Sequence, residues 1–379
     1  MILADSRIFR KNLGPFGLFQ GDLCLALLIL LSSCSPKLEK TTPDEFKQVL
    51  HGQAQGTTWN IVYYDIRERN FQKSVDSILQ RIDESISTYQ EGSVIDTWNN
   101  SDSGSLVDAL FIEVYINSWK SYKATFGAFD PTVMPLVSYW GFGPEKYVHP
   151  ESINKLEIDS ISELVSFESL ELIVNGKALD MDSLSNQGKP LKAAFLRKRD
   201  PRIKLDFNAI GQGWSVDKVA EFIESKDVKV FFIEIGGEIV AGNPKPDGEL
   251  WRFGIDKPES DLSKRALNAV ISIRNRGMAT SGNYRKFYEQ NGIKYSHTIN
   301  PHTGFPVKHN LLSATVVSTT ASEADALATA FMVMGKDSTI SYLSKRSYMS
   351  AYVYLIYDSA GVFKTYNSPQ IKSNISKVD

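Results

Sequence analysis

The sequence has few residues of the two kinds that most often bind structural zinc. Among its 379 residues are 2 cysteines, Cys24 and Cys34, and 5 histidines. Structural zinc sites use four Cys or His ligands close together. A chain this poor in both residues, with both cysteines near its start, argues against such a site.

The chain also lacks an excess of charge of either sign. Its 42 Lys and Arg residues nearly balance 44 Asp and Glu residues, which gives a formal net charge of −2 at pH 7. Domains that bind nucleic acid present clustered positive charge to phosphates, so we expect no nucleic-acid partner. Hydrophobic residues make up 42% of the chain, which is enough to bury a large core.

The apolar run Leu23–Leu31 is about half the length that a membrane-spanning helix needs. Basic residues precede it, and this order is typical of a signal peptide, which we place at residues 1–33. The run ends in Leu-Ser-Ser-Cys34, which resembles a lipobox, where the cysteine is lipidated and becomes the first mature residue. The alternative is a buried core helix with a chance cysteine, but no amphipathic pattern surrounds the run.

Residues 34–48 are polar, contain two prolines and show no apolar periodicity, so we expect a lipidated tether there. The folded body is then expected over residues 49–379. Cleavage would leave Cys34 as the single cysteine, and no disulfide is expected. These features predict an extracytoplasmic protein that is anchored to the membrane by lipid.

Hydrophobic periodicity predicts elements in the first half of the body. Residues 56–64 have the β-branched and aromatic residues of a strand, and residues 71–86 and 105–125 have apolar residues at helical spacing. Residues 128–144 combine prolines, glycines and aromatics. We expect a rigid corner there without regular structure, either purely structural or a wall for a planar ring.

Glycines mark two further segments. Residues 205–213 are expected to form a turn between a strand and a helix, where free amides and the helix dipole favour an anion. Residues 228–235 and 251–255 are expected to pair as a hairpin, with a turn at 243–248. Glycines at the end of the first of these strands predict a close approach by a backbone or ligand, or a plain bulge.

The segment that follows residue 318 predicts a helix capped by Thr319, Thr320 or Ser322. Asp325 and Thr329 lie four residues apart on it and therefore share a face. A carboxylate and a hydroxyl are hard oxygen ligands for Mg²⁺ or Ca²⁺. The alternative reading is a helix-dipole partner and a solvated hydroxyl.

Six segments in this order resemble the ApbE family of FAD:protein FMN transferases. They are FDPTVMPLVSYWGFGP, LDFNAIGQGWSVDKVA, IEIGGEIVAGNPKPDGELWRFGID, MATSGNYRKFY, HTINPHTGFPV and ADALATAFMVMG. The resemblance implies an α+β fold of T-fold-like antiparallel sheets with helices on one face. It also implies transfer of FMN from FAD to a threonine hydroxyl of an acceptor protein, with Mg²⁺, or Ca²⁺ or Mn²⁺, as the cofactor and AMP as the product.

The resemblance assigns roles to residues by their positions in these segments. The cation would be held by Asp325, Thr329 and the backbone oxygen of Ala209, and His297 would be the general base. The expected contacts to FAD are Gln55, Tyr89, Ala128, Phe129, Asp130, Asp206, Gln212, Glu238, Thr280, Ser281 and Ile299. For Thr280 and Ser281 an ordinary turn is an equal alternative.

The chain departs from the family pattern at three positions. Asn208 and Gln212 stand where the commoner turn has glycine and lysine, so one positive charge near the diphosphate is lost. Asn300 replaces the aspartate of a DPxTG turn, either as an equivalent cap or with loss of a charge near the base. These departures keep two alternatives open: an FAD pyrophosphatase that releases FMN and AMP, and a non-catalytic flavin-binding lipoprotein. As a transferase, its acceptors would be subunits of membrane redox complexes or other proteins with an FMN-binding domain.

Overall fold

The structure is a computed structural model, and it describes residues 46–143, 149–150, 152–187, 190–259, 266–284, 287–290, 292–346 and 351–378. The predicted signal peptide and all but the last three residues of the predicted tether lie outside these ranges. Within them, no helix is long and apolar enough to cross a membrane.

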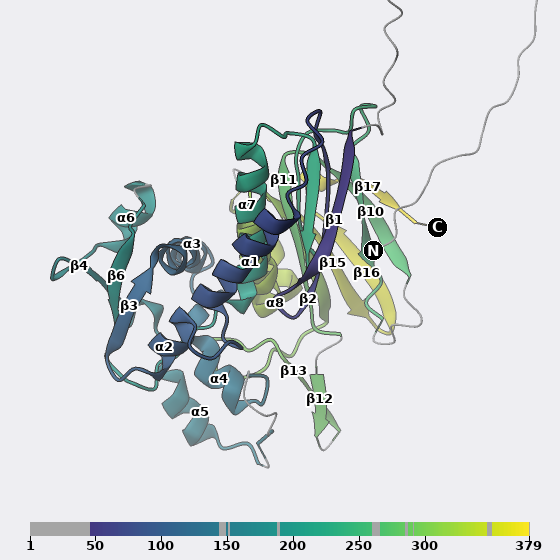
Figure 1. The fold of residues 1–379 in the computed structure, drawn as a ribbon. Helices are drawn as coiled ribbons and strands as arrows, with labels where there is room; N and C mark the ends of the chain where they lie inside the picture. The colour runs from purple at the N-terminus through teal and green to yellow at the C-terminus, as the bar shows by residue number, and fades with distance from the viewer. Residues whose placement is uncertain are drawn as a thin grey trace, which may run out of the picture.

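A sheet of eight antiparallel strands forms the centre of the molecule (Figure 1), in the order β1-β2-β7-β8-β11-β14-β15-β16. Its strands are β1 (Lys47–Ala54), β2 (Thr57–Tyr64), β7 (Phe231–Ile235), β8 (Glu238–Ala241), β11 (Arg276–Gly282), β14 (Leu311–Ser318), β15 (Tyr352–Ser359) and β16 (Val362–Asn367). The predicted strand at 56–64 is confirmed as β2. Strand β1 was not predicted, and it begins at Lys47, two residues inside the expected tether.

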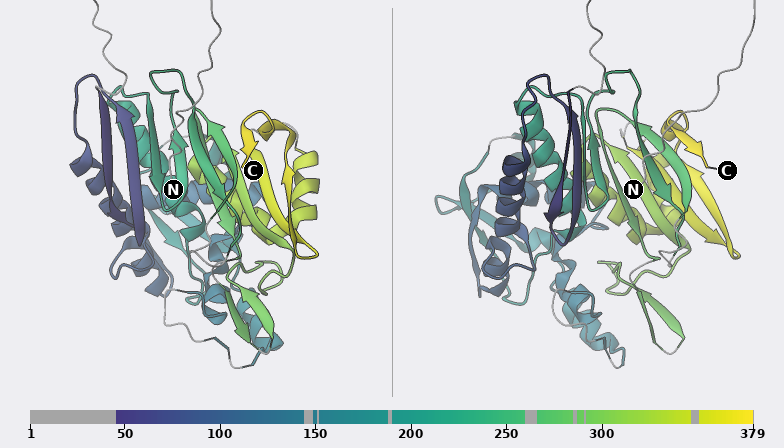
Figure 2. Two further views of the ribbon diagram at one scale, coloured as in Figure 1. Left: turned by 90° about the vertical axis from the view of Figure 1, so that its right-hand side faces the viewer. Right: turned by 45° about the vertical axis from the view of Figure 1, so that its right-hand side comes forward.

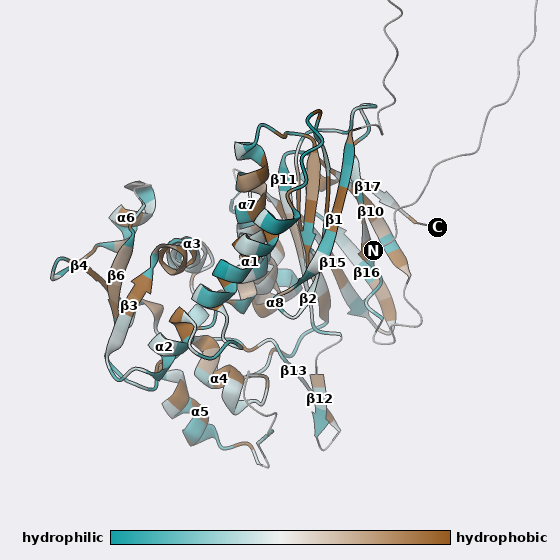
Figure 3. Ribbon diagram, in the orientation of Figure 1, coloured by the Kyte–Doolittle hydropathy of each residue, from teal (hydrophilic) through white to brown (hydrophobic). Residues whose placement is uncertain are grey.

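Three helices cover one face of this sheet: α1 (Gln72–Ile86), α7 (Asn208–Ser225) and α8 (Ala321–Ser344). Each buries an apolar face. In α1 this face includes Val75, Leu79 and Ile82, while the side turned to the viewer in Figure 3 is largely hydrophilic. The predicted helix at 71–86 is therefore confirmed, as is the α+β class with helices on one face.

The other face is covered by a second sheet of β9 (Trp251–Asp256), β10 (Leu267–Ile273) and β17 (Ile375–Lys377). The predicted hairpin of 228–235 with 251–255 is wrong. Strand β7 pairs with β8 through a turn at Gly236 and Gly237, and β9 pairs with β10 in the second sheet. Both turn glycines have positive φ, at 66° and 115°, so the chain reverses within two residues.

A separate lobe lies beside the helix layer (Figure 1) and contains the four-stranded sheet β3-β6-β4-β5. Its elements are β3 (Gly104–Asp108), α2 (Val94–Asn100), α3 (Ala109–Ala124), α4 (Met134–Tyr139), α5 (Lys155–Ser162), β4 (Glu171–Val174), β5 (Lys177–Ala178), α6 (Met181–Gln187) and β6 (Ala193–Arg197). The predicted helix at 105–125 is correct only from Ala109. Asp108 caps that helix by accepting a hydrogen bond from the Phe111 amide, so the residues before it form β3, where Leu106 is exposed.

The segment 128–144 contains more regular structure than predicted. A 3-10 turn at Pro131–Val133 leads directly into α4, so the expected corner is largely helical. Pro131 and Pro135 lie in the first turns of these two helices, where a missing amide hydrogen costs no helical hydrogen bond. The prolines therefore start helices here and do not exclude them.

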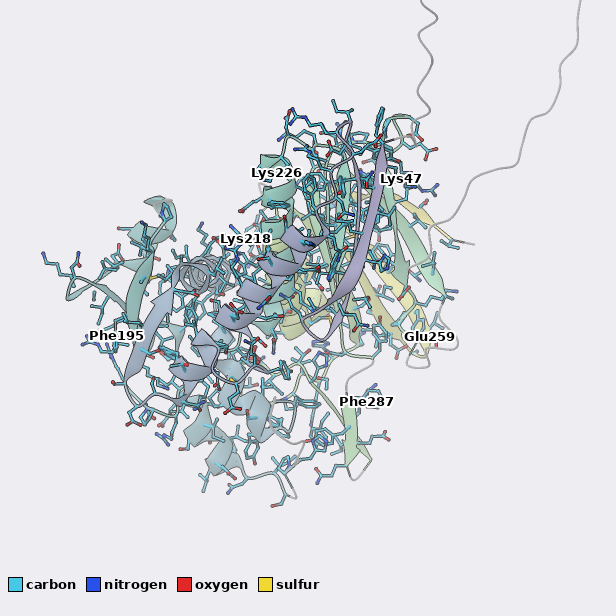
Figure 4. The ribbon with its side chains drawn as sticks, viewed as in Figure 1. Lys47, Phe195, Lys218, Lys226, Glu259 and Phe287 are labelled. Carbon is cyan, nitrogen blue, oxygen red and sulfur yellow. The ribbon has the colours of Figure 1, made fainter. Side chains whose placement is uncertain are left out.

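A two-stranded hairpin of β12 (Phe287–Gln290) and β13 (Ile293–Ser296) extends from the lower end of the molecule in both views of Figure 2. Phe287, labelled in Figure 4, lies exposed on β12. The hairpin leads directly to His297 and to the turn that follows it.

Helices α7 and α8 cross where α7 has no side chain. A Cβ atom on Gly213 would lie 2.4 Å from the carbonyl oxygen of Ala321 and 2.8 Å from the Cβ of Asp325. Asp217, one turn further along α7, accepts hydrogen bonds from the amides of Ala321 and Ser322, each at 2.8 Å. The carboxylate of one helix thus binds the positive end of the other, and Thr320 is confirmed as that helix's own cap.

This crossing generates the first prediction. Gly213→Ala is expected to lower the free energy of unfolding by about 1–3 kcal/mol, because the new methyl group meets backbone atoms that cannot move aside. Gly211→Ala is the matched control in the same helix, where a Cβ would lie 3.4 Å from a single methyl group of Ile86. The control should be neutral or stabilising by up to about 1 kcal/mol, since alanine favours helix. Urea unfolding of both variants measures this, and equal effects would contradict it.

Candidate functional site

The glycine-rich segment at 205–213 is not the turn that the sequence suggested. No strand precedes it, since residues 198–207 are irregular, and the helix begins at Asn208, so Gly211 and Gly213 lie within α7. The amide of Asn208 donates to the Asp206 carboxylate at 2.7 Å, and the amides of Ile210 and Gly211 donate to the Phe207 carbonyl. Gly213 therefore allows α7 and α8 to cross, and the predicted turn at the glycines is wrong, because they lie within a helix.

Two of the expected cation ligands meet at this crossing. The amide of Gly213 donates to Asp325 Oδ2 at 3.1 Å. In an α-helix this amide also faces the carbonyl oxygen four residues earlier, which is that of Ala209. The Ala209 oxygen, by helix geometry, and the Asp325 carboxylate therefore both face the N–H of Gly213.

The third expected ligand lies one helical turn beyond Asp325. Thr329 is partly buried on α8, and its hydroxyl is 3.2 Å from the Ser281 hydroxyl on β11. Ser281 thus faces α8, as its expected role requires. Thr280 does not: its hydroxyl pairs with that of Thr315, and its neighbour on that face, Met278, packs against the second sheet. The structure does not bring Thr280 to this site.

A second carboxylate lies close to Asp325. Glu238 begins β8, is 8% exposed, and has an oxygen, Oε2, without a hydrogen-bond partner among the described residues. Burial raises the pKa of Glu238 well above its usual value, and the nearby Asp325 charge raises it further. Burial likewise raises the pKa of Asp325.

Gln212 is positioned by the same turn. Its amide group lies against Gly236, where a Cβ atom would be 2.8 Å from Gln212 Nε2. This contact gives the glycine a packing role: it admits a side chain of α7. The sequence predicted approach by another backbone or a ligand, or a bulge; the group that approaches Gly236 is instead a side chain.

The segment at residues 128–131 is connected to the start of α7. The amide of Asp206 donates to the Pro131 carbonyl at 2.9 Å, so these two expected FAD-binding segments lie side by side. Ala128 and Phe129 pack their side chains into the core of the second lobe, which leaves only their backbone to reach a ligand. Asp130 is buried and accepts hydrogen bonds from the Thr132 amide and hydroxyl at 2.8 and 2.6 Å.

The turn after His297 packs against α4. Trp140 Nε1 donates to the Gly304 carbonyl at 2.8 Å, and the Ile299 side chain is buried beside Trp140, so this residue serves the core. Asn300 caps the turn by accepting from the His302 amide at 2.9 Å. The expectation that asparagine replaces aspartate as a cap is confirmed.

His297 itself is partly buried, and its ring lies 6.3 Å from that of Phe142 between centroids. The turn that it begins also reaches the segment at 127–130. The ring of His302 lies against Gly127, where a Cβ atom would be 3.1 Å from His302 Cε1. No role is predicted for His302 from the sequence, and only the tertiary structure shows this contact.

Of the two remaining expected FAD contacts, Gln55 is shown to contact α7. Gln55 has a φ of 53° in the β1–β2 turn, and its Nε2 donates to Ser215 Oγ of α7 at 2.7 Å. Its Oε1 is buried without a partner among the described residues. Tyr89 lies on the loop between α1 and α2 and is 70% exposed.

These donors suit a hard divalent cation better than a soft one. They comprise carboxylates, hydroxyls and a carbonyl, the oxygen ligands that Mg²⁺, Ca²⁺ and Mn²⁺ prefer. The described residues contain no cluster of three or more His, Cys, Asp or Glu side chains suited to a metal. The unpartnered Glu238 oxygen and the raised carboxyl pKa values identify a place that lacks positive charge.

The second prediction concerns Asp130, whose pKa burial raises to about 6. Between the ordinary pKa of an aspartate and about pH 6, the folded state binds more protons than the unfolded state. The stability of the fold therefore decreases as the pH rises through this range. Asp130→Asn removes this titration and keeps a good capping residue. The difference in Tm, variant minus wild type, should therefore increase from pH 4 to pH 7 in EDTA. A constant difference would contradict the assignment.

This chain is similar in sequence and in fold to known proteins. The model of the ApbE family matches residues 55–353. The FAD:protein FMN transferase of Haemophilus influenzae is 32% identical over 363 residues, covering 94% of this chain and 97% of that protein. The Escherichia coli K12 enzyme of the same name is 32% identical, covering 93% and 95%. The flavin transferase ApbE from Vibrio cholerae superposes with a TM-score of 0.71 at 30% identity, covering 86% and 99%.

Proposed function

This chain belongs to the ApbE family, and from this membership we propose that it transfers FMN from FAD to a threonine hydroxyl of an acceptor protein with the help of Mg²⁺. The observation that carries the proposal is the hydrogen bond from the Gly213 amide of α7 to Asp325 Oδ2 of α8, which brings the helix that carries Ala209 against the helix that carries Asp325 and Thr329. Expected ligands from segments more than 100 residues apart in sequence are neighbours there.

The reaction is a phosphoryl transfer. The threonine Oγ forms a bond to the phosphorus on the FMN side of the diphosphate, the bond from that phosphorus to the bridging oxygen breaks, and AMP leaves with that oxygen. Little covalent work falls to the protein. Its task is to hold the two oxygens in line and to balance charge.

The cation would be held by Asp325, Thr329 and the Ala209 oxygen, and when bound it neutralises charge on the diphosphate. Gln212, in place of a lysine, brings an amide without charge, so more of this neutralisation depends on the cation. The neighbouring segments at 128–131 and 206–212 offer backbone groups to FAD.

His297 would take the proton of the threonine hydroxyl on an imidazole nitrogen, since histidine titrates near neutral pH. The following turn is fixed to α4 by Trp140 and capped by Asn300, so the ring is carried by a defined backbone.

We further propose that the protein works at the extracytoplasmic membrane surface, held by lipid on Cys34. The support is the order of basic residues, apolar run and cysteine in residues 1–34. Acceptors at that location would be proteins with an FMN-binding domain, such as subunits of membrane redox complexes.

The test mixes the full-length protein in detergent with FAD, Mg²⁺ and an FMN-binding domain from the same organism. The intact mass of the acceptor should increase by one FMN, and AMP should appear in solution. Free FMN and AMP with an unchanged acceptor would indicate a pyrophosphatase. Unchanged FAD would indicate a flavin-binding protein without catalysis.

The third prediction is that Asp325→Ala abolishes transfer, because it removes a charged oxygen from the cation site. The fold should survive, since the variant loses one hydrogen bond and a buried carboxyl group whose charged form is unfavourable. Acceptor mass measures activity and circular dichroism measures the fold. A folded variant with normal transfer would remove Asp325 from the site.

The fourth prediction is that His297→Ala slows transfer by about 10²- to 10⁴-fold if the imidazole is the general base. His51→Ala, on the exposed side of β1, is the matched control and should leave the rate unchanged. The rate of acceptor labelling measures both. Near-normal transfer by the first variant would exclude the proposed role.

A further inference from the structure

Two glutamates flank the turn between β7 and β8, and they differ in one respect. Both are 8% exposed. Glu234 is fully engaged: its Oε2 accepts from Asn60 Nδ2 at 2.7 Å, and its Oε1 accepts from the Gly237 amide at 2.9 Å. Glu238 leaves Oε2 buried without a hydrogen-bond partner in the part of the chain that the structure describes.

A buried carboxylate oxygen without a partner is unfavourable, because desolvation is not offset by a new interaction. Such a group is retained when something else supplies positive charge or a donor. The salt bridges found among the described residues do not include Glu238. An external cation would supply this missing charge.

Glu238 lies beside the carboxylate that the proposed cation needs. On α7, Gln212 contacts Gly236 of the turn, and the next residue, Gly213, donates to Asp325. The turn and Asp325 therefore meet α7 at neighbouring residues. Strand β8 also packs against both α7 and α8.

We propose that Glu238 contributes its carboxylate as a further ligand of the divalent cation at Asp325 and Thr329. The inference rests on the proposed function for the presence of that cation. Two carboxylates would balance its two positive charges, so the occupied site would carry no net charge within a buried region. The resemblance to the family implied a contact to FAD for Glu238, and binding to the cation would be a different role for the same carboxylate.

The experiment measures cation binding without FAD, so that it does not depend on turnover. Mn²⁺ is titrated into the full-length protein, and free Mn²⁺ is followed by electron paramagnetic resonance. Glu238→Gln should weaken Mn²⁺ binding at least about tenfold, the loss typical when a group that supports a metal is removed. In EDTA the same variant should have an equal or higher Tm, because a buried unpaired charge is gone.

Glu234→Gln is the matched control, since it changes the equally buried glutamate of the same turn, whose partners are already in place. It should leave the Mn²⁺ affinity unchanged. An unchanged Mn²⁺ affinity of the Glu238→Gln variant would overturn the inference. If that variant also had a lower Tm than the wild type in EDTA, the role of Glu238 would be structural. In both cases wild-type Mn²⁺ binding would leave the proposed function standing. If the wild-type protein bound no Mn²⁺ and still labelled the acceptor in EDTA, the proposal that transfer needs a cation would be wrong.

Discussion

The crossing of α7 and α8 at Gly213 is the constraint on which the site depends. Only a residue without a side chain lets the Ala321 backbone approach α7 so closely, and that approach brings Asp325 to the Gly213 amide. Asp217 then fixes the start of α8 through two backbone amides. Since each helix carries part of the proposed cation site, their spacing determines whether the ligands meet.

Three carboxyl groups around the crossing of α7 and α8 have pKa values above their usual range. Burial raises the pKa of Asp217 to about 6, and it raises those of Asp325 and Glu238 as well. Carboxylates concentrated in this way oppose folding at neutral pH unless a cation is bound. A binding site often costs stability in the free protein, and this arrangement would couple cation binding to the stability of the helix crossing.

The errors in the sequence-based predictions have local physical causes. Gly211 and Gly213 were assigned to a phosphate-binding turn, because a glycine pair is equally compatible with a turn and with close helix packing. Residues 105–108 were joined to the following helix, although Asp108 was an available cap signal. Strand β9 was paired with β7, since alternation identifies a strand and does not identify its partner.

The sequence by itself determined the family, the α+β class, the helices α1 and α8 and the strand β2, and it nominated Asp325, Thr329 and His297 for the site, because helical spacing and ordered motifs are local features. The tertiary structure decided which of these residues meet. It placed Ser281 with Thr329 and left Thr280 on the opposite face of the sheet. It also revealed Asp217 and the unpartnered Glu238 oxygen. Such contacts join segments distant in sequence, and their burial and charge coupling exist only once the chain has folded.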